Sequence, residues 1–261
     1  MDQSYALITG ASMGLGRAFA YEFASRGYNL LLLSLPNQDI ESVADECRSR
    51  YGIECRTFEL DLTSKVELMA FIEEVKSKYE VSVLVNNAGI GGSQSFSTVN
   101  YRYIENMLML NIFAATTLTH QLLPILKRQH DGYILNISSM ASLTPTGYKT
   151  VYPASKAYIR HLSIGLREEL RGSGVHVSTA ILGPMPTQAD IIRRIETQGK
   201  FGKMLTIDPK DVACKCADGL FAKKGEITIG GFNQLTKIFL KFAPYKLIAK
   251  VMTKKVKNEI E

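Results

Sequence analysis

Ser139, Tyr152 and Lys156 have the types and spacing expected of a site that moves a proton at a carbonyl oxygen. Tyr152 and Lys156 are four residues apart in a segment predicted to be helical, 152–172, so their side chains share one helix face. A phenol with a pKa of roughly 10 is a poor base at neutral pH, but a cation within a few ångströms lowers such a pKa by about 1–3 units. We therefore expect Lys156 to lower the pKa of Tyr152 toward the range in which proton transfer is efficient.

Ser139 lies thirteen residues before Tyr152, at the end of an apolar run, 133–138, that is predicted to be a strand. The carboxyl ends of the strands in an open parallel sheet are where ligand-facing groups lie. A tyrosine and a lysine at this spacing more often form a solvated helix face than a catalytic pair. The interpretation therefore depends on the rest of the chain.

A glycine-rich turn joins the first predicted strand, 5–8, to the first predicted helix, 17–26, and reads Thr9-Gly10-Ala11-Ser12-Met13-Gly14-Leu15-Gly16. Glycines at such a junction let the backbone turn tightly and approach a pyrophosphate, whose charge faces the helix N-terminus. A second buried-strand run, 81–85, ends in Asn86-Asn87-Ala88-Gly89. These features favour a dinucleotide site.

Together, the glycine-rich turn, the Asn-Asn-Ala-Gly segment, Asn111, Ser139, Tyr152 and Lys156 resemble the short-chain dehydrogenase/reductase family. The resemblance extends from residue 4 to about residue 230, with the motifs in the family's order and spacing. It implies an NAD(P)-dependent enzyme that interconverts a secondary alcohol and a ketone. It also implies an α/β fold: a Rossmann-type doubly wound parallel sheet with strand order 3-2-1-4-5-6-7 and helices on both faces.

The hydrophobic pattern agrees with this fold, because apolar runs suited to buried parallel strands alternate with helical patterns. Strands are predicted at 5–8, 29–33, 54–60, 81–85, 133–137, 175–182 and 226–229, and helices include 64–79, 101–128 and 209–221. The chain has no internal repeat or flexible linker, so we expect one catalytic domain over 1–231, with a substrate lid at 186–205.

The resemblance assigns roles to four residues. Tyr152 gives or takes the proton at the substrate oxygen as hydride moves to or from the nicotinamide, and Lys156 also binds the nicotinamide ribose. Ser139 positions the substrate oxygen, since the thirteen-residue spacing fits it better than Ser138. Asn111 is an unusual residue in an apolar helix, and its main chain is expected to hold a water that relays protons to Lys156. The alternative for Asn111 is a capped or solvated amide.

The cofactor residues are also implied by the resemblance: glycines approach the pyrophosphate, Ser12 bonds a ribose or phosphate oxygen, and Asp61 accepts from the adenine amino group. The expected set is Gly10, Ser12, Gly14, Leu15, Gly16, Ser34, Asp61, Leu62, Asn87, Ala88, Gly89, Tyr152, Lys156, Gly183 and Thr187. Leu182 stands where the family has a proline before Gly183, and this leaves the contacts of that loop open.

The choice of cofactor depends on Ser34, at the end of the second predicted strand. Members that bind NAD tend to have aspartate there, which binds the ribose hydroxyls and repels a 2′-phosphate. Its absence favours NADP, although Leu35 and Met13 supply no positive charge for that phosphate. NADP is therefore expected, and NAD stays open.

The net charge of +6 is concentrated at the C-terminus, where residues 232–261 hold seven lysines and two glutamates, a net of 7 − 2 = +5. No basic stripe with interleaved aromatics runs through the body, which argues against nucleic acid as a partner. Residues 232–257 form an amphipathic helical pattern interrupted at Pro244, and we interpret 232–261 as an appendage. Its apolar face either packs on the body or on a sister subunit, or attaches to an anionic membrane surface.

No signal-peptide pattern precedes the first strand, and no apolar stretch is expected to reach the roughly 18 residues of a membrane span. Four cysteines without a Cys-x-x-Cys pair favour reduced structural thiols over a metal site. A cytoplasmic location is expected, at the inner membrane surface if the tail binds lipid. The resemblance implies a homodimer or homotetramer paired through the two long helices at 101–128 and 154–171.

The substrate is expected to be a small carbonyl or alcohol compound with an apolar body, such as a ketone, a 3-oxoacyl compound or a steroid, because the lid positions are aliphatic. Two other functions stay open. One is a catalytically silent dinucleotide-binding or scaffold protein, which would need none of the four site residues. The other is a sugar epimerase or dehydratase, which usually has a larger C-terminal substrate domain.

Overall fold

The computed structural model describes residues 4–185 and 207–260. Its centre is a sheet of seven parallel strands in the order β3-β2-β1-β4-β5-β6-β7, as the sequence predicts. The strands are β1 (Tyr5–Thr9), β2 (Asn29–Ser34), β3 (Cys55–Glu59), β4 (Val81–Asn86), β5 (Gly132–Ser139), β6 (Val175–Leu182) and β7 (Glu226–Thr228). The order reverses between β1 and β4, which is where such sheets bind ligands.

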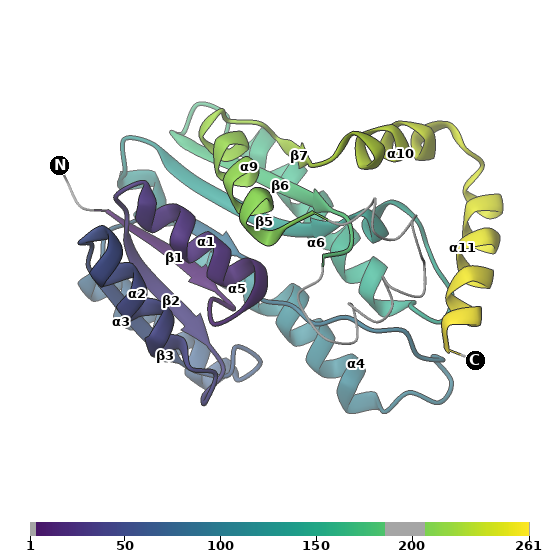
Figure 1. Ribbon diagram of the computed structural model, residues 1–261, viewed down its shortest axis with the longest axis horizontal. Coiled ribbons are helices and arrows are strands. Elements are labelled where there is room, and N and C mark those ends of the chain that lie inside the picture. Colours follow the sequence, from purple (N-terminus) through teal and green to yellow (C-terminus); the bar gives the residue numbers. More distant parts are fainter. Residues whose placement is uncertain (1–3, 186–206, 261) are drawn as a thin grey trace.

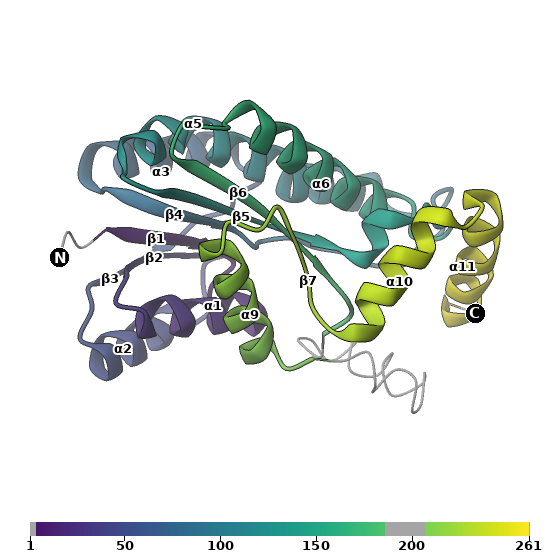
Figure 2. The ribbon, with the colours of Figure 1, turned by 90° about the horizontal axis from the view of Figure 1, so that it is seen from above.

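Helices cover both faces of the sheet (Figure 1), and Figure 2 shows the three layers edge on. One face carries α1 (Gly14–Ser25), α2 (Ile40–Tyr51) and α9 (Pro209–Phe221). The other carries α3 (Lys65–Lys78), α5 (Ala115–Arg128) and α6 (Val151–Glu169). The remaining helices are α4 (Tyr101–Leu108), a π-helical turn η1 (Met109–Ala114), a 3₁₀ turn η2 (Met140–Leu143), α10 (Gly231–Phe242) and α11 (Tyr245–Ile260).

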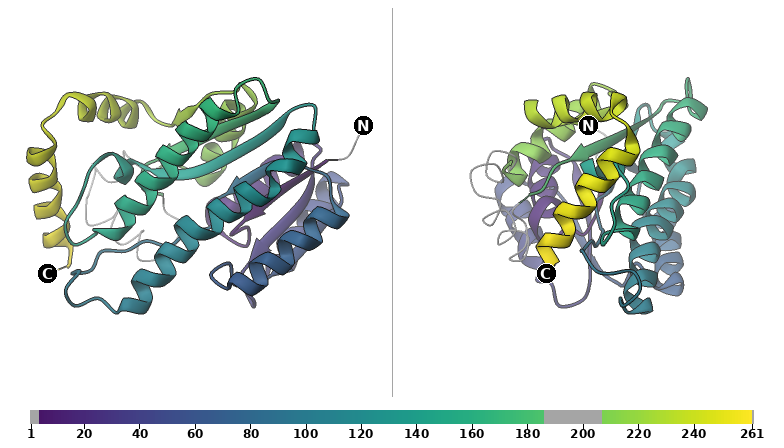
Figure 3. Two further views of the ribbon diagram at one scale, coloured as in Figure 1. Left: turned by 180° about the vertical axis from the view of Figure 1, so that it is seen from behind. Right: turned by 90° about the vertical axis from the view of Figure 1, so that its right-hand side faces the viewer.

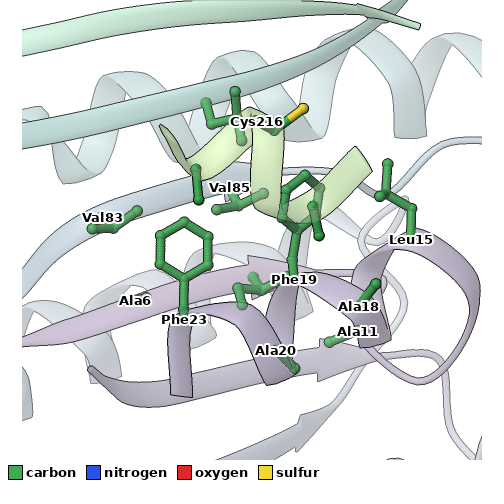
Figure 4. Packing of buried hydrophobic residues seen from close by; sticks show 14 of the residues in the cluster. Ala6, Ala11, Leu15, Ala18, Phe19, Ala20, Phe23, Val83, Val85 and Cys216 are labelled. Atoms are coloured by element: carbon green, nitrogen blue, oxygen red, sulfur yellow. The ribbon is translucent and has the colours of Figure 1, made fainter. Parts of the chain in front are cut away.

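Each face of the sheet has its own hydrophobic core, because successive strand side chains point to opposite faces. In β1, Ile8 belongs to the core under α1 and α9, whereas Leu7 belongs to the core under α3 and α5. Phe19 and Phe23 of α1 fill the first core together with Cys216 of α9 (Figure 4). This packing fixes the helices against the sheet and thereby places the carboxyl ends of the strands at one edge.

The long helix predicted at 101–128 is continuous, but its middle turn has π geometry over Met109–Ala114. By length and composition alone, the whole stretch Tyr101–Arg128 could cross a membrane. This differs from the expectation from the sequence, in which polar residues interrupt the apolar run. Core helices of globular proteins meet the same criteria, and Leu118 and Leu122 of α5 are buried in the second core. We therefore regard it as a core helix.

The C-terminal segment forms two helices that are separated at Pro244, as the pattern predicts (Figure 3). One side of this pair contacts the body: Asn233 of α10 and Val256 of α11 are buried, and the backbone N–H of Gly147 donates to Thr253 Oγ1 at 2.8 Å. The other side exposes large apolar side chains. These include Leu235, Ile238, Phe239, Phe242, Leu247 and Val251.

Candidate active site

The end of β5 and the first turns of α6 bring Ser138, Ser139, Tyr152 and Lys156 together. The two serines have different environments. Ser138 is 2% exposed, and its hydroxyl donates to the backbone carbonyl of Lys156 at 2.8 Å. Ser139 is partly exposed, accepts a bond from the backbone N–H of Ala141 at 3.1 Å, and interacts with the hydroxyl of Tyr152. Only Ser139 therefore has a hydroxyl available toward the site.

Tyr152 is held beside the loop that follows β4. A methyl group at Gly91 would stand 2.7 Å from the Tyr152 ring, so the ring packs directly on a position where only glycine fits. Burial raises the pKa of Tyr152, while the hydrogen bond with Ser139 lowers it by a smaller amount. This direction is opposite to the predicted one. The cation expected to lower this pKa, Lys156, is not among the causes of the shift, and desolvation of the phenol dominates.

Lys156 is nearly fully buried, and its Nζ donates to the carbonyl of Ile137 at 2.9 Å. Burial lowers the pKa of Lys156 to about 8, because the charged ammonium loses its hydration. A methyl group at Gly89 would lie 3.2 Å from this nitrogen and 3.1 Å from Asn111 Oδ1. The backbone at Gly89, the ammonium of Lys156 and the amide of Asn111 thus meet at one point.

Asn111 lies inside the π-helical turn and is 2% exposed, so its amide is not solvated. Its Oδ1 accepts from the N–H of Ile90 at 2.9 Å, and its Nδ2 donates to the carbonyl of Ile90 at 2.8 Å. The same Nδ2 also donates to Ser155 Oγ at 3.0 Å. The side chain therefore ties the loop after β4 to α6, and π turns occur frequently at functional sites. Neither Ile90 nor Ser155 is singled out by the sequence.

The glycine-rich turn lies at the N-terminus of α1 and fits a bound pyrophosphate. A side chain on Gly16 would overlap the carbonyl of Gly10 and come within 2.8 Å of Asn87 Nδ2. The backbone at Gly16 therefore packs directly against the backbone at Gly10, and only glycine fits there. The first turn of α1 has no acidic residue and no side-chain cap at Met13. Its N–H groups are therefore open to an anion.

Thr9 joins this turn to the segment after β4, a role that we did not predict although Thr9 begins the glycine-rich run. Its Oγ1 accepts from the backbone N–H of Asn87 at 3.0 Å and of Ala88 at 2.9 Å. Asn87 Nδ2 in turn donates to the carbonyl of Thr9 at 2.9 Å. The two segments that are expected to face the cofactor are thus cross-linked by side chains.

Ser34, Asp61 and Leu62 lie at the same edge of the sheet. Ser34 is 6% exposed, and its hydroxyl donates to the carbonyl of Leu35 at 2.9 Å. Asp61 Oδ1 accepts from the backbone and hydroxyl of Thr63, and Leu62 is buried. Glu59 is the partner of Ser34 across β2 and β3, and its carboxylate accepts from the backbone N–H of Asn37 at 2.8 Å.

Gly183 follows β6, and its backbone packs on Asn233 of α10. Thr187 and the predicted lid, 186–205, lie outside the described residues. A small recess opens beside Tyr152 between α4 and the loops before α4 and α6. It is lined mainly by apolar and aromatic side chains, which include Phe96, Val99, Tyr103, Ile104 and Met107.

Within residues 4–185 and 207–260, no three His, Cys, Asp or Glu side chains gather into a group that could hold a metal ion. Cys47, Cys55 and Cys216 are buried, and burial raises the pKa of the Cys47 thiol to about 11. These thiols are unreactive parts of the core.

Comparison with known proteins identifies the family. The family model described as short chain dehydrogenase matches residues 4–197. The very-long-chain 3-oxoacyl-CoA reductase of Anas platyrhynchos is 33% identical over 182 residues, which cover 68% of this chain and 58% of that protein. The inactive hydroxysteroid dehydrogenase-like protein 1 of Homo sapiens is 32% identical over 179 residues, which cover 68% and 54%. The chain thus spans less than two thirds of the length of these relatives.

Solved structures show the same fold. A 7beta-hydroxysteroid dehydrogenase superposes with a TM-score of 0.88 at 21% identity, covering 95% of this chain and 96% of that one. A short-chain dehydrogenase from Sphingobium yanoikuyae in complex with NADPH superposes with a TM-score of 0.78 at 25% identity, covering 92% and 96%.

Proposed function

This chain belongs to the short-chain dehydrogenase family of oxidoreductases, and we propose that it interconverts a secondary alcohol and a ketone with a nicotinamide dinucleotide. The observation that supports this most directly is the convergence of Ser139, Tyr152 and Lys156 around the backbone of Gly89 and Gly91. A proton-transfer group, a hydroxyl that can orient an oxygen and a cation lie together at the carboxyl edge of the sheet. The catalytic residues that we propose are Asn111, Ser139, Tyr152 and Lys156.

In this mechanism the bound cofactor supplies or accepts the hydride. Tyr152 gives a proton to the substrate oxygen in reduction and takes it back in oxidation, and Ser139 orients that oxygen by a hydrogen bond. Lys156 provides positive charge next to the phenol and hydrogen-bonds the nicotinamide ribose. Asn111 holds the Ile90 loop and the π turn in place, and its main chain positions the water that relays protons to Lys156.

We propose NADP(H) as the cofactor, since the hydroxyl at Ser34 does not repel a 2′-phosphate as a carboxylate would. The NADPH complex of the Sphingobium yanoikuyae enzyme agrees with this choice. Phosphates would be held by the N–H groups at the start of α1, with Gly10, Ser12, Gly14, Leu15 and Gly16 around them. The adenosine would contact Asp61 and Leu62, and the nicotinamide would contact Gly183 and Thr187. The segment Asn87, Ala88 and Gly89 would line both the adenosine and the nicotinamide side.

The substrate that we propose has an apolar body, such as a 3-oxoacyl chain or a steroid. Apolar side chains line the recess beside Tyr152, and the names of the relatives include a 3-oxoacyl-CoA reductase and hydroxysteroid dehydrogenase-like proteins. A panel of ketones and alcohols with NADPH and NADH would test this. Tyr152→Phe is expected to lower kcat on the order of 10²–10⁴-fold and to leave the Kd for cofactor nearly unchanged.

The alternative is a catalytically silent dinucleotide-binding protein, and one relative is named inactive. If the protein binds the cofactor but turns over no compound in the panel, the catalytically silent alternative is favoured. Equal turnover by Tyr152→Phe and the unchanged protein would instead contradict the mechanism.

For the organisation of the chain, we propose a catalytic body at 1–231 with the lid 186–205, and an appendage at 232–261. The body is proposed to form a homodimer or homotetramer through the two long helices at 101–128 and 154–171, which include α5 and α6. The exposed apolar side of α10 and α11 has Lys246, Lys250 and Lys254 nearby, all exposed, and is proposed to touch the inner membrane surface from the cytoplasm.

A further inference from the structure

A second lysine, Lys149, stands over the ring of Tyr152. It belongs to the loop that leads into α6, and its Nζ lies 5.1 Å from the centroid of the ring. This is within the roughly 6 Å over which a cation is attracted to an aromatic face. Lys149 is half-buried and lines the recess together with Tyr152. The site thus contains a cation besides Lys156.

The loop that carries Lys149 is held in an unusual conformation. The preceding residue, Tyr148, has a φ of 58°, which is strained for a bulky side chain. Its carbonyl accepts from the N–H of Gln94 at 2.6 Å. On the other side, Gly147 donates to Thr253 of α11, and a methyl group at Gly147 would stand 2.6 Å from Thr253 Cγ2.

Figure 2 shows α11 beyond the carboxyl ends of the strands, where this loop lies. The loop before α4 and the C-terminal helix therefore clamp the backbone on one side of Lys149, and α6 begins on its other side. The position of Lys149 over the ring is imposed by segments far apart in the sequence.

A further positive charge near Tyr152 would stabilise its phenolate form, which the buried site disfavours. Burial raises the pKa of Tyr152, so the phenolate is disfavoured. Lys156 is itself desolvated and bonded to the carbonyl of Ile137, and its pKa is lowered to about 8. Among the described residues that line the recess, the titratable groups besides Tyr152 are Lys149 and Tyr103, and of these Lys149 lies over the ring.

We propose that Lys149 is a positioning residue that acts through Tyr152, and that its ammonium over the ring stabilises the phenolate relative to the phenol. The physical reason is that a cation is attracted more strongly to a ring that carries a full negative charge than to a neutral ring. This inference rests on the proposed role of Tyr152 in proton transfer, but its first test needs no substrate.

The test is a pH titration of the full chain labelled with ¹³C at tyrosine Cζ, with the Tyr152 signal assigned by its loss in Tyr152→Phe. In Lys149→Met the titration midpoint of Tyr152 is expected to rise by on the order of one pH unit, and Lys149→Arg should restore it. The matched control is Lys65→Met, because Lys65 Nζ lies 5.2 Å from the ring of Phe113, which does not titrate. Lys65→Met should leave the midpoint unchanged.

An unchanged midpoint in both Lys149→Met and Lys149→Gln would overturn the inference, whether or not the chain proves to be an oxidoreductase. With an active substrate from the panel, the pH profile of kcat should move in the same direction as the midpoint. A rise in KM for anionic substrates alone, with no movement of the profile, would make Lys149 a substrate-binding residue and would also overturn the proposal.

Discussion

Ser138 donates a 2.8 Å hydrogen bond to the backbone carbonyl of Lys156, and this bond links the C-terminal end of β5 to α6, the helix that carries Tyr152. The neighbouring Ser139 has its hydroxyl directed to the site instead. Adjacent serines in a strand point to opposite sides, and here one is structural and the other is free to act.

Exchanging each serine should therefore have different effects. Ser138→Ala removes a buried hydrogen bond to the Lys156 carbonyl, which should lower the free energy of unfolding by about 0.5–1.5 kcal/mol. Ser139→Ala removes the bond that its hydroxyl accepts from the Ala141 N–H, which should lower that free energy by about 0.5–1 kcal/mol, and it should also lower kcat. Urea unfolding and turnover measured on both variants decide this. A larger loss of kcat in Ser138→Ala, measured where both variants are folded, would contradict the assignment of Ser139.

Burial of Lys156 should make stability depend on pH. Its pKa falls from 10.5 to about 8 on folding, so the folded state binds fewer protons than the unfolded state between these values. The protonated group therefore opposes folding below about pH 8, and this penalty fades as the pH rises toward 10.5. Relative to Lys156→Met, the unmodified protein should gain about 2 kcal/mol in unfolding free energy between pH 7 and pH 10.

If the unfolding free energies of the two proteins change in parallel with pH, Lys156 does not titrate in this range.

Lys156→Ala is further expected to weaken cofactor binding as well as turnover, which distinguishes it from Tyr152→Phe.

Cofactor preference should respond to charge at the end of β2. Ser34→Asp is expected to shift kcat/KM toward NADH by adding ribose bonds and repelling a 2′-phosphate. Glu59 pairs with Ser34 across the strands, so Glu59→Gln should shift preference further toward NADPH. A preference for NADH of tenfold or more in the unmodified protein would mean that the proposed cofactor is wrong.

Self-association should depend on the outer faces of α5 and α6. Ile164 and Tyr158 are 39% and 40% exposed, and Tyr158 is bonded to Thr116 of α5. Light scattering at micromolar concentration should give a dimer or tetramer mass, and Ile164→Glu should lower it. Val66→Glu on α3 is the matched control, since Val66 is exposed and lies on a different helix. A monomer mass for the unmodified protein would exclude this contact.

Membrane contact should depend on the exposed side of the C-terminal helices. The protein is expected to sediment with anionic vesicles at low salt, less so at high salt, and not after exchange of Leu235 and Phe239 to serine. These side chains are 68% and 67% exposed, so their loss should not disturb packing. Val66→Ser serves as the control. Failure to sediment at low salt would leave the tail with its packing role alone.

The sequence by itself determined where the strands and most helices lie, and its resemblance to the family implied the strand order and the proposed site residues. Buried parallel strands are continuous apolar runs, and turns that approach a phosphate need glycine, so local composition carries this information. The helix predicted at 209–221 is confirmed as α9, and it begins at Pro209 because Asp208 caps it through the backbone N–H of Lys210.

The tertiary structure decided what depends on segments far apart in the sequence. The π turn at Asn111 accompanies paired hydrogen bonds to Ile90, and the clamp on Lys149 needs Thr253, which lies 106 residues after Gly147. The pKa of Tyr152 was predicted in the wrong direction, because the spacing to Lys156 shows a nearby charge but not the burial of the phenol. Desolvation is set by every atom packed around a group, and no local pattern in the sequence encodes it.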